Sequence, residues 1–90
     1  MQKDYRWNED KDEWLRRTRG FGFADIVEAA ENGRVVKDID NPSARYPDQR
    51  LLIVEIDGYA IGVPYVLEGE TAFLKTAFPS RKLKRLYMEN

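Results

Sequence analysis

The sequence predicts an α+β domain: an antiparallel sheet of three to four strands, two N-terminal helices packed on one face, and a short C-terminal helix. Three observations support this class. Two segments with helical spacing come first, three β-rich segments follow in close succession, and an Asp-Gly pair separates the first two of those. Ninety residues predict a single domain over residues 1–90, with one core and a shallow surface site.

The composition excludes several kinds of chemistry. The chain has no cysteine and no histidine, which rules out disulfides, thiolate metal sites and the usual general base near neutral pH. The carboxylates show no metal-ligand spacing and no glycine-rich phosphate loop is present, so we expect neither a metal nor a cofactor. No apolar run approaches the ~20 residues that span a bilayer, and the N-terminal segment does not read as a signal peptide. We therefore expect a cytoplasmic protein without membrane contact.

The first predicted helix follows Asn8, a residue type favoured at N-caps. Acidic residues fill its first turns, arginines fill its last turn and Gly20 follows, the order that the helix dipole and the C-cap favour. Trp14 and Leu15 are its predicted apolar anchors.

The second predicted helix runs from 23 to 32 and is ended by Gly33, because apolar side chains recur there at helical spacing. A short strand is predicted at 34–39. The segment 40–49 contains two prolines and polar side chains, which predicts a long loop.

Three strands are then predicted at 50–57, 59–67 and 71–78. If Asp57-Gly58 is a two-residue turn, the register places the apolar partners of the first two strands on one face, which must be the face covered by helices. The opposite face carries Ala60, Gly62 and Pro64 in the second strand, so we expect it to be shallow or hollow, with a bulge or bend at Pro64.

The same parity places Phe73 and Lys75 on this open face, where an aromatic ring and a lysine beside small residues suit a nucleotide. Ser80 is the predicted cap of a last helix over 81–88, with Leu83 and either Leu86 or Tyr87 turned inward.

Positive charge gathers at the C-terminal end. Within residues 71–90 only Glu89 opposes five cations, which are Lys75, Arg81, Lys82, Lys84 and Arg85. This pattern fits either an electrostatic footprint for a polyanion or a solvated helix face. Without histidine, the mechanism that remains depends on cationic side chains. A 2′-hydroxyl attacks its neighbouring phosphodiester, and lysine and arginine stabilise the charge on the pentavalent phosphorus.

Four short motifs carry a family resemblance over nearly the whole chain. Tyr-Arg-Trp-Asn stands at 5–8, Arg-Gly-Phe-Gly-Phe-Ala-Asp-Ile at 19–26, Arg50 precedes a predicted strand, and Pro-Ser-Arg-Lys stands at 79–82. In this order they resemble the BrnT-type toxins of bacterial toxin–antitoxin systems, within the RelE-like superfamily. The resemblance implies a small ribonuclease fold and a partner antitoxin, typically a ribbon-helix-helix repressor.

The sequence departs from that family at two positions. The family's Lys-His-Gly turn appears as Thr-Arg-Gly at 18–20, and its last-strand arginine has Lys75 as a near match, offset by about one position. Lysine does not make the bidentate phosphate contact that arginine makes.

The leading hypothesis is a metal-independent endoribonuclease toxin that cleaves mRNA, inhibits translation and is neutralised by its antitoxin. Its scissile-phosphate ligands are predicted to be Arg50, Lys75 and Arg81, and Lys82, Lys84 and Arg85 are predicted to hold flanking RNA phosphates. The alternative is a degenerate toxin that only pairs with an antitoxin and co-represses its operon, and a third possibility is a structural domain without nucleic-acid contact.

Overall fold

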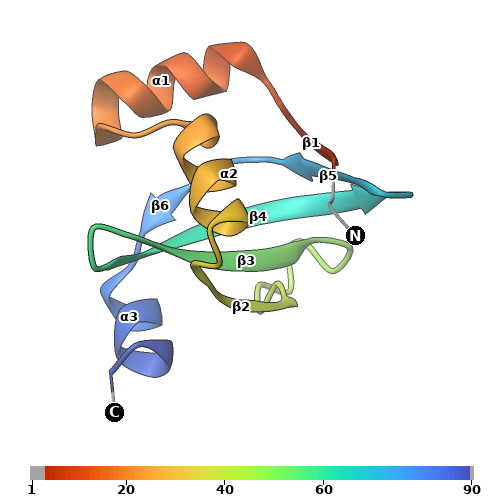
Figure 1. Ribbon diagram of the computed structural model, residues 1–90. Coiled ribbons are helices and arrows are strands. Elements are labelled where there is room, and N and C mark those ends of the chain that lie inside the picture. Colours follow the sequence, from red (N-terminus) through yellow and green to blue (C-terminus); the bar gives the residue numbers. More distant parts are fainter. Residues whose placement is uncertain (1–3, 90) are drawn as a thin grey trace.

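The computed structural model describes residues 4–89, and in this range no helix has the length and apolar character needed to cross a membrane. One sheet separates two layers of helices (Figure 1). The helices α1 (Glu9–Arg19) and α2 (Phe23–Glu31) lie over one face, and α3 (Arg81–Tyr87) lies against the other. The strands are β1 (Asp4–Trp7), β2 (Val35–Asp40), β3 (Arg50–Ile56), β4 (Tyr59–Glu68), β5 (Thr71–Leu74) and β6 (Phe78–Pro79).

The sheet is larger than predicted and is mixed rather than antiparallel. Its strand order is β1-β5-β4-β3-β2, with β6 pairing with β4 off this path. The pairs β2–β3, β3–β4, β4–β5 and β4–β6 are antiparallel, but β1 runs parallel to β5, with Asp4 opposite Thr71. The α+β class and the two N-terminal helices are confirmed, whereas the count of three to four strands is wrong. β1 is only four residues long, and it is held by a partner distant in sequence, so no local pattern marks it.

The Asp-Gly hairpin is confirmed. Asp57 and Gly58 both have positive φ, at 53° and 79°, as a tight primed turn requires. The register follows as predicted, with Leu52 opposite Val63 and Val54 opposite Ile61. These side chains enter a core cluster with Leu15 of α1 and with Phe23, Ile26 and Ala29 of α2.

The helix caps are confirmed as well, but one predicted anchor is wrong. The side chain of Asn8 accepts a hydrogen bond from the backbone N–H of Lys11, and Gly20 adopts the left-handed conformation at the end of α1. Leu15 is fully buried, whereas Trp14 is 36% exposed, with the ammonium of Lys11 lying 4.1 Å from its ring centroid. Trp14 therefore lies on the outer surface of α1.

The predicted last strand over 71–78 is broken into two pieces. β5 ends at Leu74, residues 75–77 form no strand, and β6 resumes the pairing with β4 opposite Ile61 and Gly62. Pro64 explains where the first piece ends, because its carbonyl accepts from the N–H of Lys75 at 2.9 Å. In an antiparallel strand the N–H and the C=O of one residue point to the same neighbouring strand. The C=O of Pro64 points toward the β5 side, so the N–H that proline lacks is missing on that side and not on the β3 side.

On the β3 side β4 keeps its register, with Pro64 opposite Leu51, so the bulge predicted in β4 is not found there. On the other edge of β4 the register shifts by one residue between the pair Tyr65–Leu74 and the pair Gly62–Phe78, so the extra residue lies in the facing segment 75–77. A further shift lies in β2, between Val35 and Lys37.

The second face of the sheet is covered rather than open. A Cβ added at Gly62 would lie 2.9 Å from Leu83 Cδ1 and 2.9 Å from the Phe78 ring, so the absence of a side chain allows α3 and β6 to approach. Leu83 and Tyr87 join the smaller core cluster on this face, while Leu86 is 58% exposed. The predicted hollow is therefore filled at its centre, and the remaining concavity lies beside α3.

Candidate nucleic-acid interface

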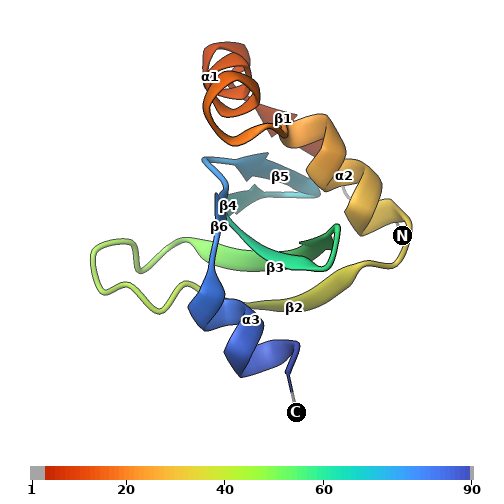
Figure 2. The ribbon, with the colours of Figure 1, turned by 90° about the vertical axis from the view of Figure 1, so that its left-hand side faces the viewer.

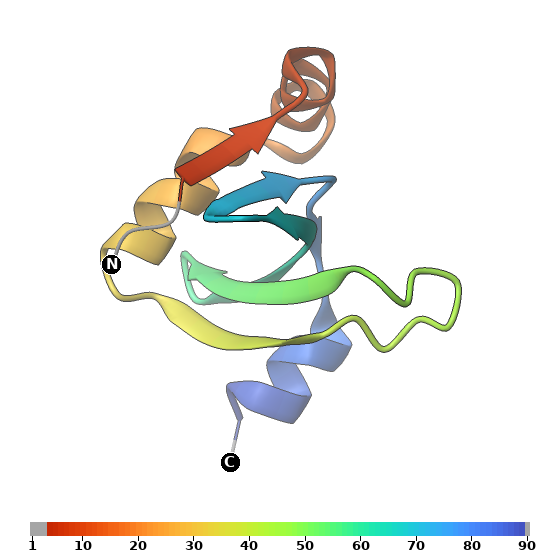
Figure 3. The same ribbon diagram turned by 90° about the vertical axis from the view of Figure 1, so that its right-hand side faces the viewer.

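A groove of about 790 Å³ lies between the loop 41–49, the segment that follows β5, and α3. The loop projects beyond the ends of β2 and β3, as Figures 2 and 3 show from opposite sides. The floor is apolar and includes Leu51, Pro64, Phe78 and Leu83. Polar side chains from all three segments line the walls, namely Asn41, Ser43, Tyr46, Gln49, Lys75, Thr76, Ser80 and Lys82.

Two of the six predicted site residues, Lys75 and Lys82, line this groove. The ammonium of Lys75 lies 4.6 Å from the centroid of the Phe73 ring, so these two side chains lie side by side as the strand parity predicts. Asp and Glu are absent from the described residues that line the groove, and its charge is therefore positive.

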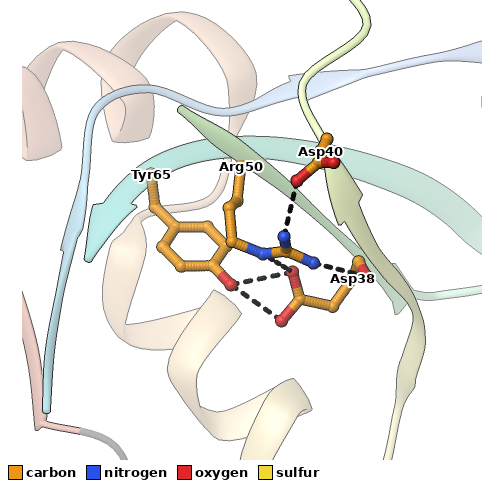
Figure 4. A network of polar contacts seen from close by, with 4 residues as sticks. All are labelled: Asp38, Asp40, Arg50 and Tyr65. Atoms are coloured by element: carbon orange, nitrogen blue, oxygen red, sulfur yellow. Dashed lines mark hydrogen bonds and ion pairs between the residues drawn. The ribbon is translucent and has the colours of Figure 1, made fainter. Parts of the chain in front are cut away.

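Arg50 lies elsewhere, in a network with three partners from neighbouring strands (Figure 4). Its Nε lies 3.2 Å from Asp38 Oδ1, its Nη1 lies 2.7 Å from Asp40 Oδ1, and its Nη2 donates to the backbone carbonyl of Asp38 at 3.0 Å. The phenol of Tyr65 donates to the carboxylate of Asp38, with the hydroxyl 2.7 Å from each carboxylate oxygen. Hydrogen bonding with Tyr65 and then with Asp38 raises the pKa of Arg50 above its ordinary value. The guanidinium is charged at physiological pH and already bound to carboxylates.

This network lies on the other face of the sheet from the groove. Arg50 pairs with Tyr65, which belongs to the main core, whereas the adjacent pair of Leu51 and Pro64 lines the groove. Successive side chains of a strand point to opposite faces, so Arg50 and Lys75 do not converge on one phosphate.

The hairpin register alone places Arg50 opposite Tyr65, so this pair could have been found from the sequence. The sequence does not predict Asp38 and Asp40 as partners of Arg50, because their position depends on the bulge in β2.

Arg81, Lys84 and Arg85 lie around a second, smaller hollow of about 260 Å³, which Tyr59 and Glu89 also line. The ammonium of Lys84 lies 5.4 Å from the centroid of the Tyr59 ring. Residues three and four positions apart lie on the same side of a helix, whereas adjacent residues are rotated by about 100° about the helix axis. For this reason Lys82 reaches the groove while the other three cations of α3 line the second hollow.

The structure thus separates the predicted catalytic residues. Arg50 is held by carboxylates, Lys75 lines the groove, and Arg81 lines the second hollow with Lys84 and Arg85. The polar groove residues that sequence reasoning missed are Asn41, Ser43, Tyr46, Gln49 and Thr76, none of which is charged and none of which lies in a recognisable motif.

No cluster of acidic side chains within residues 4–89 has the composition to hold a metal ion. No protein-family model, curated protein or solved structure matches the chain. The resemblance to BrnT-type toxins therefore remains a prediction from the residues themselves.

Proposed function

We propose that this domain is the toxin of a bacterial toxin–antitoxin pair, which cleaves mRNA in the cytoplasm without a metal ion and is neutralised by an antitoxin of the ribbon-helix-helix type. The observation that carries the proposal is the joint presence of Lys75 and Lys82 in one groove that has no carboxylate among its described lining residues. Its volume of about 790 Å³ lies in the range of small-ligand sites, which admits a nucleotide.

The chemistry proposed for the groove depends on positioning and charge. In a strand held in line, the 2′-oxygen forms a bond to the neighbouring phosphorus as the bond from phosphorus to the 5′-oxygen breaks, and the two ammonium groups stabilise the negative charge that develops on the phosphoryl oxygens. Water takes the proton of the 2′-hydroxyl and protonates the leaving 5′-oxygen, so the products are a 2′,3′-cyclic phosphate and a 5′-hydroxyl. Arg50 has no direct part in this scheme, because its guanidinium already binds Asp38 and Asp40. Arg81, Lys84 and Arg85 supply flanking phosphate contacts on the far side of α3.

The dispersal of the arginines favours a second candidate, the non-catalytic toxin that only pairs with its antitoxin. Arg50 and Arg81 lie outside the groove, so its described lining residues offer only lysines as cations and no bidentate phosphate ligand.

Induction in bacteria separates the two candidates. The wild-type chain should arrest growth, and the purified protein should cleave single-stranded RNA in the presence of EDTA. Lys75→Ala and Lys82→Ala should each reduce cleavage about 100-fold, the scale of losing one charge-stabilising group. Arg81→Ala should weaken RNA binding more than cleavage.

Lys37→Ala is the matched control, because this lysine is exposed on β2 and lies outside the groove. If the wild-type chain leaves both growth and RNA intact, the endoribonuclease proposal is wrong. Co-purification with the product of the adjacent gene, without cleavage, would then support the second candidate.

A further inference from the structure

Two amide side chains face each other across the base of the loop 41–49, and their orientation is determined by hydrogen bonds. The backbone N–H of Ser43 donates to Asn41 Oδ1 at 2.9 Å, which leaves the nitrogen of this amide to face Gln49. Asn41 Nδ2 then donates to Gln49 Oε1 at 3.3 Å. The oxygen of Gln49 therefore faces Asn41, and its Nε2, with two N–H donors, has no hydrogen-bond partner among residues 4–89.

The groove beside these amides is rich in donors. The ammonium groups of Lys75 and Lys82 can only donate, and the hydroxyls of Tyr46 and Thr76 can donate as well. The strongest acceptors, carboxylates, are absent from the described lining residues. A ligand that fits this wall presents oxygen or nitrogen acceptors rather than amino groups.

The loop also supplies an aromatic surface and is held in place. Tyr46 is 48% exposed at the groove, where its ring is accessible for stacking. The backbone N–H of Asn41 donates to the carbonyl of Gln49 at 3.0 Å, and just outside this pair Arg50 joins Asp40 at 2.7 Å. Both ends of the loop are therefore fixed before any ligand arrives, which reduces the entropy lost on binding.

We propose that this part of the groove reads one base of a single-stranded RNA, with Tyr46 stacking on the base and Gln49 Nε2 donating to its edge, and that it prefers uracil and guanine over cytosine and adenine. This inference rests on the proposed RNA-directed function of the same groove. The keto oxygens O4 of uracil and O6 of guanine accept hydrogen bonds, whereas cytosine and adenine carry amino groups at the equivalent positions. An amino group opposite Gln49 Nε2 would leave two donors facing each other.

The test compares octanucleotides of uridine and of cytidine, each labelled with fluorescein and titrated with the full chain in fluorescence anisotropy. Wild-type protein should bind the uridine octamer about tenfold more tightly, the scale of one well-placed base-edge contact. Gln49→Ala should reduce this ratio to near one. Gln49→Glu, which replaces the donor by an acceptor, should bring the ratio to one or below.

Tyr46→Ala serves as the companion variant. It should weaken binding of both octamers about tenfold, the scale of losing one stacked base, and leave their ratio unchanged. Circular dichroism of each variant establishes that it is folded.

The outcomes separate the two proposals. Equal binding of both octamers by the wild-type protein, or a ratio that survives both Gln49 variants, overturns the base-reading inference and leaves the RNA-directed function standing. If the wild-type chain binds neither octamer even at low salt, the RNA-directed function itself is wrong and base reading is overturned with it.

Discussion

Arg50 Nε lies 3.2 Å from the carboxylate of Asp38, so an arginine that the sequence offers as a phosphate ligand already has an anionic partner on the next strand. Asp40 and Tyr65 complete the network, which joins β2, β3 and β4 at the base of the loop 41–49. Arg50 therefore acts on the groove only by holding the loop that forms one of its walls.

Replacing Arg50 should lower the stability of the fold and should not remove a direct contact to RNA. Arg50→Ala removes the cation that faces Asp38 and Asp40, and we expect the free energy of unfolding, measured by urea denaturation, to fall. Arg45→Ala is the control, because Arg45 is exposed in the same loop and makes no ion pair with the described residues. Unchanged stability together with lost RNA binding would show that Arg50 contacts RNA directly.

Tyr65→Phe should be more costly than the loss of one hydroxyl at the surface. The Tyr65 side chain is buried, and its phenol is bound to the carboxylate of Asp38. We expect a loss of about 1–2 kcal/mol in the free energy of unfolding. Tyr59→Phe should change it by less than about 0.5 kcal/mol, because the Tyr59 hydroxyl has no hydrogen-bond partner within the described chain. Equal losses from the two variants would contradict the role given to the Asp38 contact.

Asp12 should be essential to the packing of α1 against α2. Its Oδ1 accepts from the backbone N–H of Phe23, the first residue of α2, at 2.7 Å, and its Oδ2 lies 3.1 Å from Arg16 Nε. Asp12→Ala leaves this buried N–H without a partner and should lower the thermal midpoint by several degrees, corresponding to about 1–3 kcal/mol. Asp10→Ala, on the exposed side of the same helix, is the control and should shift the midpoint much less. Equal shifts of the midpoint in the two variants would mean that the contact from Asp12 to α2 adds nothing to stability.

Gly62→Ala should displace α3 and deform the groove. The added methyl group would lie 2.9 Å from Leu83 Cδ1 and from the Phe78 ring, so both must shift, at a cost of about 1–3 kcal/mol by chemical denaturation. Combining it with Leu83→Ala tests the cause, because removing Cδ1 relieves one of the two clashes. The double variant should then be more stable than the sum of the single losses predicts, and strict additivity would argue against the clash.

The salt dependence of affinity tests which side of α3 contacts RNA in the proposed complex. If RNA phosphates reach both the groove and the second hollow, Lys82→Ala and Arg85→Ala should each reduce the slope of log affinity against log salt by about one. Their double variant should reduce it by about two. A slope that falls only with Lys82→Ala would confine the RNA to the groove.

Local features of this chain follow from the sequence alone. Asn8 and Gly20 define the ends of α1, and Asp57-Gly58 defines the register of β3 and β4, because caps and tight turns depend on residues close together in the chain. That register also determines which side chains of these two strands face the helices.

Only the tertiary structure decided where the charges lie. The pairing of β1 with β5, the bulge in β2 and the close approach of α3 at Gly62 all join segments distant in sequence. They place two carboxylates on Arg50 and separate Lys82 from Arg81 across α3. A side chain's partner depends on contacts that the chain makes only once folded, so a run of cations in the sequence does not determine which of them share a site.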